Sequence, residues 1–179
     1  MKLVKASQLI ENVRLLVKDS IRTKYSDYEI LKATGAALDL LSDALSRHWC
    51  VETIREADID ITDGVGPLPK NFRSVASVRS LSPQQEAPLL IGQYRTVCGK
   101  ILTNAGTVHL TYWSRPLPPE TGDDDIDLAD RFLTPASRIT ALVLAGDWDK
   151  AEALSDATAQ KAKTDGVGAI DVTPPMWGG

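Results

Sequence analysis

The sequence predicts an α+β protein, mainly a bundle of about four helices with a small inserted antiparallel β-meander and an extended C-terminal arm. Three observations lead to this fold class. Apolar residues recur at helical spacing near both ends, polar and apolar residues alternate in the middle, and the last residues are rich in glycine and proline. We expect one domain over residues 1–163 and an arm over residues 164–179.

The first two helices are expected over about residues 7–22 and 27–49. Leu9 and Val13 begin an apolar stripe on the first helix. Ser26 and Glu29 have the spacing of a capping box, in which each side chain bonds the backbone N–H of the other residue. Gly35 lies inside the second helix, where glycine costs about 1 kcal/mol relative to alanine. It indicates either a close approach of another backbone, such as a neighbouring subunit's, or a tolerated defect.

The β insert is expected over about residues 51–113. Asn104-Ala105-Gly106 has the composition of a three-residue hairpin loop, with glycine at the position that needs a positive φ. Residues 107–113 then alternate, which places Val108, Leu110 and Tyr112 on one buried face. Trp113 falls on the other face, where it is either an anchor for a partner or covered by the helices.

The last two helices are expected over about residues 135–145 and 148–162, after a stiff linker at Arg115–Pro119. Thr134 has the chemistry of an N-cap, and Pro135 suits the first helical position because its missing N–H costs nothing there. Between linker and helix, residues 123–130 are strongly acidic. They form either a divalent-cation site or a solvated loop, although the spacing of a calcium-binding EF-hand loop is missing.

The C-terminal arm is too rich in proline and glycine for a helix. A terminal segment of this kind is often disordered. Its exposed aromatic and aliphatic residues favour a different interpretation, an arm that docks on a neighbour as an extended segment. The candidate partner-binding residues are Asp171, Val172, Pro174, Pro175, Met176 and Trp177 on the arm, together with Trp113.

Composition limits the class of function. The 179 residues carry a net charge of −4, which argues against a free-standing nucleic-acid-binding protein because such proteins usually show a basic patch. Two cysteines are too few for a disulfide framework and fit a reducing cytoplasm. The N-terminus lacks the pattern of a signal peptide, and the longest apolar run is far below the ~20 residues of a membrane span, so we expect a soluble protein.

Catalytic chemistry is not evident in the sequence. His48 and His109 are the only histidines, and no nucleophile motif or phosphate-binding loop accompanies them. A zinc site at His48 and Cys50 would need two further ligands from Cys98, His109 or carboxylates, which is a weak signal. We therefore expect no enzyme, cofactor or metal. The alternatives are a phage tail-associated cell-wall hydrolase and, less favoured, a small DNA-binding regulator.

Four motifs occur in an order that resembles the head-to-tail adaptor (connector) proteins of tailed bacteriophages. Tyr25–Leu31 is similar to the opening of that family's second helix, and Leu68-Pro69-Lys70-Asn71-Phe72 to the entry of its β region. The stretch Val108–Pro118 is similar to its exit from that region, and Gly146-Asp147 to its final helix link. The resemblance covers roughly residues 8–162.

This resemblance implies a structural virion protein, assembled in the host cytoplasm. Copies would form a ring, commonly a dodecamer, below the portal protein, and would offer an attachment surface for tail proteins of the nozzle or tail tube. Double-stranded DNA would pass through the ring during genome packaging and ejection without sequence-specific binding. An acidic protein suits that channel because it repels the phosphate backbone. No membrane is implied.

Overall fold

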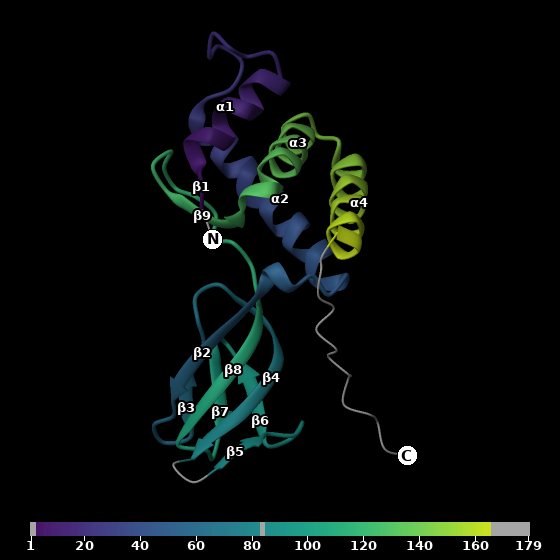
Figure 1. The fold of residues 1–179 in the computed structure, drawn as a ribbon. Coiled ribbons are helices and arrows are strands. Elements are labelled where there is room, and N and C mark those ends of the chain that lie inside the picture. The colour runs from purple at the N-terminus through teal and green to yellow at the C-terminus, as the bar shows by residue number, and fades with distance from the viewer. Residues whose placement is uncertain (1–2, 83–84, 166–179) are drawn as a thin grey trace.

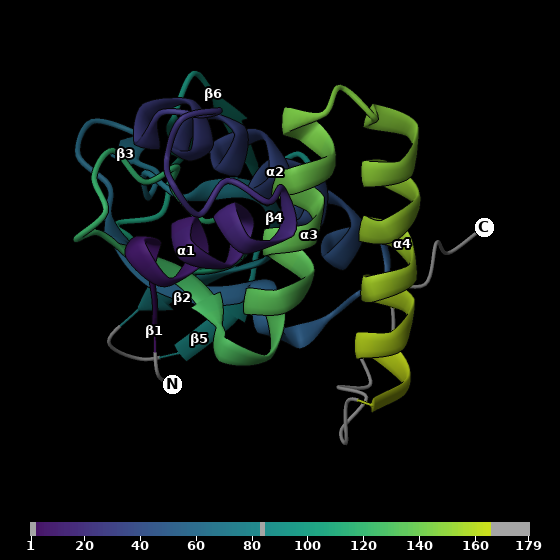
Figure 2. The same cartoon turned by 90° about the horizontal axis from the view of Figure 1, so that it is seen from above.

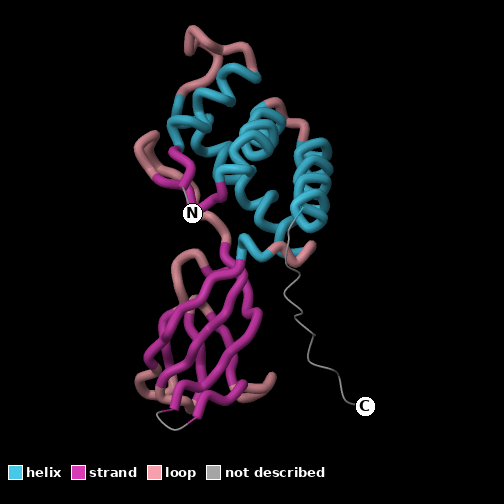
Figure 3. Tube along the Cα trace, viewed as in Figure 1, coloured by secondary structure: helices cyan, strands magenta, loops and turns pink. Residues whose placement is uncertain are grey.

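A computed structural model describes residues 3–82 and 85–165 of the chain. The molecule is elongated and has two lobes, which we call the helical lobe and the β lobe (Figure 1). The first and last described segments, residues 3–50 and 115–165, build the helical lobe, and the segment between them builds the β lobe. Figure 3 shows how completely the two kinds of structure separate, since the helices gather in one lobe and most strands in the other.

The helical lobe holds four α-helices within the described residues: α1 (Ala6–Leu16), α2 (Asp27–Arg47), α3 (Leu133–Leu144) and α4 (Trp148–Asp165). Strand β1 (Leu3–Lys5) pairs antiparallel with β9 (Asp125–Ala129), and the 3₁₀ helix η2 (Asp130–Phe132) leads into α3. Helix α2 packs against both α3 and α4, which lie side by side in Figure 2. The first and last described segments of the chain therefore share one core.

Helix α2 supplies much of that core through one apolar face. Ile30, Leu38 and Leu41 are almost fully buried on it. The capping box that the sequence predicts at its start is confirmed, because the Glu29 N–H donates to Ser26 Oγ at 3.2 Å and the Ser26 N–H donates to Glu29 Oε2 at 2.8 Å. The hydrogen bonds from Ser26, its backbone N–H first, lower the pKa of Glu29.

The β lobe begins with a short 3₁₀ helix, η1 (Val51–Thr53). Its strands are β2 (Ile54–Asp60), β3 (Val65–Pro67), β4 (Phe72–Ser82), β5 (Gln85–Pro88), β6 (Tyr94–Val97), β7 (Lys100–Thr103) and β8 (Thr107–Ser114). They form two antiparallel sheets, with strand orders β2-β8-β4-β5 and β3-β7-β6. The longest strand, β4, lies beside β8 at the centre of the larger sheet.

A second hydrophobic core lies between these two sheets. Val108, Leu110 and Tyr112 project into it from β8, which confirms the alternation predicted for this stretch. Ile101 enters from β7 in the other sheet and is fully buried. Because both sheets contribute to one cluster, each buries the apolar face of the other.

Ion pairs join the two lobes at their junction. Arg55 on β2 donates to both carboxylate oxygens of Asp127 on β9, at 3.2 and 2.7 Å. Arg73 on β4 pairs with Asp43 on α2, and Arg131 on η2 pairs with Glu52 on η1. These contacts link the β lobe to the helical lobe at several points around the connection.

Gly35 on α2 meets the linker that returns from the β lobe. A Cβ added at this glycine would lie 3.0 Å from Cβ of Pro118. A close approach therefore exists at this glycine, but its partner is a side chain of the same chain and not another backbone, as one of the two alternatives had it. The proline-rich linker packs along α2 and ties the two lobes together.

The predicted balance of helix and strand is wrong. The sequence led us to expect mainly a helical bundle with a small meander, whereas the protein is 43% helical and 29% strand, with three antiparallel sheets. The physical reason is the second sheet. The residue pattern predicts a single meander with one buried face, but β3, β6 and β7 form a separate layer that makes a second core with the larger sheet.

Two helix boundaries also differ from the expectation. The first helix, expected to reach residue 22, ends at Leu16, because the chain turns at Lys18 with a φ of 56°. The third helix begins at Leu133 instead of residue 135, and Thr134 does not cap it. Helix η2 runs directly into α3, so Thr134 already lies inside the helix.

The hairpin predicted at Asn104-Ala105-Gly106 is wrong as well. These residues do connect β7 to β8, but the two strands belong to different sheets and do not pair with each other. Gly106 does not have a positive φ. Its carbonyl instead accepts the N–H of Ile61 at 2.8 Å, so the loop carries the chain from one sheet to the other.

Candidate contact surfaces

The turn between α1 and α2 is held in shape by one buried carboxylate. Asp19 is 1% exposed and accepts the backbone N–H groups of Thr23, Lys24 and Tyr25 at 2.9 to 3.0 Å. Arg14 donates to the same carboxylate at 2.7 Å and to Asp27 at 2.5 Å. Among these contacts the hydrogen bond from the Lys24 N–H contributes most to lowering the pKa of Asp19. The turn is thus preorganised.

This preorganised turn presents apolar side chains to solvent. Leu15 is 70% exposed, Ile21 78% and Tyr28 71%. Exposed cations lie in the same segment, namely Lys18, Arg22 and Lys24. We call this end of the molecule the helical pole; it lies at the top of Figure 1, furthest from the β lobe. An apolar surface with a cationic rim fits a protein partner that carries acidic residues.

A groove lies next to the helical pole, between the end of α1, α3 and α4. Its volume is about 450 Å³, and we call it the helical groove. It is lined by Leu16, Val17, Lys24, Tyr25, Arg138, Ala141, Leu142, Ala145 and Leu154. Most of these side chains are aliphatic, so the groove suits an apolar ligand with a negative charge.

A second exposed apolar surface lies in the loop between β5 and β6. Leu90 is 66% exposed and Ile91 80%. The loop is a tight turn, because the Leu90 N–H donates to Gln93 Oε1 at 2.7 Å and the Gln93 N–H donates to the Leu90 carbonyl at 3.0 Å. Gly92 supplies the positive φ of 101° that this turn requires. We call this end the β pole; the loop lies at the far end of the β lobe (Figure 1).

Trp113 is buried within its own chain. It is 7% exposed, and Trp49 packs edge-on against it with ring centroids 5.6 Å apart. The sequence left two alternatives for Trp113, an anchor for a partner or cover by the helices. The structure favours cover by the helical lobe, since Trp49 comes from the turn that follows α2. Trp49 is itself 56% exposed, so it is the more accessible aromatic ring at the junction. The other predicted partner-binding residues, 171–177, lie outside the described residues.

A groove of about 600 Å³ lies at the junction of the lobes. Arg73 and Arg115 line it, facing Asp39 and Asp43 of α2. Two cations and two anions balance each other there. The exposed ring of Trp148 is its main apolar feature.

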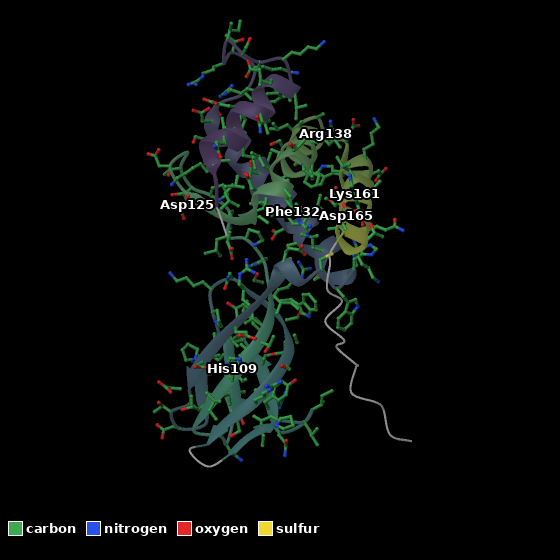
Figure 4. The ribbon with its side chains drawn as sticks, viewed as in Figure 1. His109, Asp125, Phe132, Arg138, Lys161 and Asp165 are labelled. Carbon is green, nitrogen blue, oxygen red and sulfur yellow. The ribbon has the colours of Figure 1, made fainter. Side chains whose placement is uncertain are left out.

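Several carboxylates of the acidic stretch have structural partners. Asp124 accepts the backbone N–H groups of Thr121 and Glu120, which lower its pKa. Asp125, labelled in Figure 4, pairs with Lys5 at 2.8 Å. Across residues 3–82 and 85–165, no group of three or more His, Cys, Asp or Glu side chains has an arrangement that could hold a metal ion. These carboxylates shape the loop and the lobe junction.

The residues that were weighed as zinc ligands are not brought together in the part of the chain that the structure describes. Cys50 is buried in the helical lobe, where desolvation raises the pKa of its thiol and its Sγ lies 3.5 Å from the Ala159 carbonyl. Cys98 is exposed in the turn between β6 and β7. His109 lies on β8 and contacts Asp58 at 2.6 Å (Figure 4).

A retaining or inverting glycosidase needs a carboxylic acid whose pKa is raised, paired with a second carboxylate. In the part of the chain that the structure describes, the carboxyl groups with a shifted pKa are Asp19, Glu29 and Asp124, and all three shift downward. Hydrogen bonds from nearby backbone N–H groups stabilise their charged forms. These three groups therefore serve as anchors for turns and a helix end.

Sequence reasoning missed both poles. Ile21 falls inside the helix that the sequence predicts over residues 7–22, but it lies in the solvent-facing turn after α1. Leu15 is helical as predicted, and it is exposed near the end of α1. Leu90-Ile91 precede Gly92, and this apolar pair beside a glycine was the available signal for an exposed turn. Arg14 and Asp19 could have been recognised as opposite charges five residues apart, but only the turn makes them neighbours.

No known family model matches the chain, and no curated protein is similar to it. The described helices include none that is both long and apolar enough to cross a membrane.

Proposed function

We propose that this chain is a structural adaptor of a tailed-bacteriophage virion, which joins a ring below the portal and provides the attachment surface for tail proteins. The observation that carries the proposal is the pair of preformed apolar surfaces at opposite ends of an elongated molecule. A protein that connects two different partners needs two such surfaces. The order of sequence motifs described above supports the same class.

The two poles differ in chemistry, which suits two different partners. The helical pole combines Leu15, Ile21 and Tyr28 with nearby cations, whereas the β pole presents Leu90 and Ile91 on a tight turn. Both turns are fixed by hydrogen bonds between side chain and backbone. A preorganised loop loses little entropy on binding, so more of its contact energy contributes to affinity.

Ring formation follows from repetition of one contact. When the same two patches meet in every pair of neighbouring copies, a heterologous interface closes into a ring if the rotation between copies divides a full turn, as the proposed dodecamer requires. Ion pairs hold the two lobes of each copy together, so each copy can act as a rigid wedge. With its net charge of −4, a ring of such copies would repel the DNA that slides through it.

The decisive experiment mixes the purified chain with the portal protein of the same phage and measures the mass of the complex by native mass spectrometry. We expect a multi-copy ring on the portal. Leu15→Asp with Ile21→Asp tests the helical pole, and Leu90→Asp with Ile91→Asp tests the β pole. Leu117→Asp is the control, because Leu117 is 47% exposed but belongs to neither pole.

One pole variant should abolish assembly on the portal while the other still assembles and loses only attachment of the tail protein. The control should assemble normally. A wild-type chain that stays monomeric with every virion component would overturn the proposal, and so would equal assembly by all three variants. Turnover of cell-wall glycan, or a salt-dependent shift of free DNA, would favour the hydrolase or the regulator instead.

A further inference from the structure

The helical groove has an aliphatic floor and a cationic rim. Leu142 and Leu154 line it and are half-buried, and Leu16 lines it and is 47% exposed; we call these aliphatic side chains its floor. Arg138 on α3 makes no hydrogen bond or ion pair with any residue in the ranges 3–82 and 85–165. Lys24 contacts only the ring of Tyr25 through its ammonium group among those residues. A ligand for this groove should combine apolar side chains with a carboxylate.

The chain itself contains a segment with this composition. Residues 166–179 carry one acidic side chain, Asp171, and no basic residue. Around Asp171 lie Ile170 and Val172, and Met176 and Trp177 follow the two prolines. The segment is therefore complementary to the groove in both charge and polarity.

The segment is also long enough to reach the groove from where the described chain ends. Asp165 lies at the lower end of α4 and Arg138 higher on the neighbouring helix α3 (Figure 4). Leu154 lies 11 residues before Asp165 on α4, about 16 Å back along the helix axis at 1.5 Å per residue. Eleven extended residues beyond Asp165 span about 36 Å. A segment that reverses direction at the glycines after Asp165 can follow α4 back to the groove.

We propose that residues 166–179 of the same chain bind along the helical groove. Asp171 pairs with Arg138, and Met176 and Trp177 cover the aliphatic side chains of the floor. Attachment to α4 gives the segment an effective concentration on the order of millimolar, so even weak contacts keep it bound. The inference concerns the isolated chain and does not rest on the adaptor function, in which a partner would compete with the groove for these residues.

Disulfide trapping in the full-length chain tests the site. In a Cys98→Ser background, Gly178→Cys is combined with Ala145→Cys, which lies in the groove. The matched control combines Gly178→Cys with Ala153→Cys. Ala153 is exposed on α4 outside the groove lining and lies closer than Ala145 to Asp165 along the chain. The rate of disulfide formation under mild oxidation is followed by mass spectrometry.

We expect an intramolecular disulfide that forms faster at Ala145→Cys than at Ala153→Cys. Arg138→Glu should slow disulfide formation at Ala145→Cys by about fivefold, the scale of one exposed ion pair. Arg138→Lys should keep most of the original rate. Equal rates at the two positions would overturn the inference. Disulfides that form only between chains would also overturn it. So would a rate of disulfide formation at Ala145→Cys that Arg138→Glu leaves unchanged.

Discussion

At the scale of single residues, the most constrained group is the Asp19 carboxylate. It bonds three backbone N–H groups and Arg14 while almost completely buried. These contacts hold the backbone of the helical pole, where Ile21 is 78% exposed. A surface that is proposed to bind a partner thus depends on a polar residue beneath it.

Asp19→Asn should lower the stability of the protein above pH 4, because an amide cannot replace the charge that faces Arg14 and the backbone donors. The sign of the pH dependence follows from the lowered pKa of Asp19. Its contribution is fully present above the unfolded-state pKa of about 3.9 and is lost as the pH falls through the folded-state pKa. Urea midpoints measured between about pH 2 and 7 should therefore fall less steeply at acid pH in the variant than in the wild type.

Asp63→Asn is the control for this change, since Asp63 is exposed and its side chain makes no hydrogen bond or ion pair among the described residues. Its urea midpoint should fall at acid pH as steeply as that of the wild type. If the urea midpoint of Asp19→Asn fell at acid pH as steeply as that of the control, Asp19 would not anchor the turn.

Gly66 on β3 has no room for a side chain. An added Cβ would lie 2.6 Å from Ile59 Cγ2 and 2.7 Å from Ile61 Cδ1. Gly66→Ala should therefore destabilise the β lobe by about 1–3 kcal/mol, the usual cost of overpacking. Gly106→Ala is the matched control, because nothing lies within 4 Å of its Cβ position. Equilibrium unfolding in urea checks both, and equal midpoints for the two variants would contradict the prediction.

At the scale of elements, α2 and β8 organise their lobes. Helix α2 packs against α1, α3 and α4, and β8 lies between β2 and β4. Both elements have strong local signals in the sequence, a capping box in one case and strict alternation in the other. Local signals of this kind survive folding because tertiary packing reinforces them.

Ser26→Ala should destabilise the protein by about 1 kcal/mol, because the Glu29 N–H at the start of α2 loses its acceptor. Ser20→Ala, which removes an exposed hydroxyl from the same turn, should change stability little. Thermal unfolding followed by circular dichroism measures the difference. Indistinguishable melting temperatures for the two variants would rule out a stabilising capping box.

At the scale of the whole molecule, two separate hydrophobic cores are joined by ion pairs and a proline-rich linker. The helical core contains Leu38 and the β core contains Leu110, and both side chains are buried. The junction between the cores combines ion pairs of Arg55 and Arg73 with the edge-on contact of Trp49 and Trp113. Each lobe therefore depends mainly on its own core for stability.

Leu110→Ala should cost about 2–5 kcal/mol and act mainly on the β lobe. Native-state hydrogen exchange should show faster exchange in β2, β4 and β8, with α2 and α3 nearly unchanged. Leu38→Ala should give the reverse pattern. Equal loss of protection in both lobes from either variant would mean that the chain unfolds as one cooperative unit.

The sequence by itself determined the local features of this protein. Ser26 and Glu29 form their box through contacts three residues apart, and the alternation of Val108, Leu110 and Tyr112 defines a buried face whatever the neighbouring strands are. Such features depend on backbone periodicity and short-range hydrogen bonds, which a pattern of residues encodes directly.

Only the tertiary structure decided how those elements meet. It placed β7 and β8 in different sheets, covered Trp113 with Trp49, and brought Arg55 to Asp127 across 72 positions of the chain. It also left Leu90 and Ile91 uncovered at one pole. The physical reason is that burial and pairing between distant segments depend on which surfaces fold against each other, and that choice minimises the free energy of the whole chain instead of any one stretch.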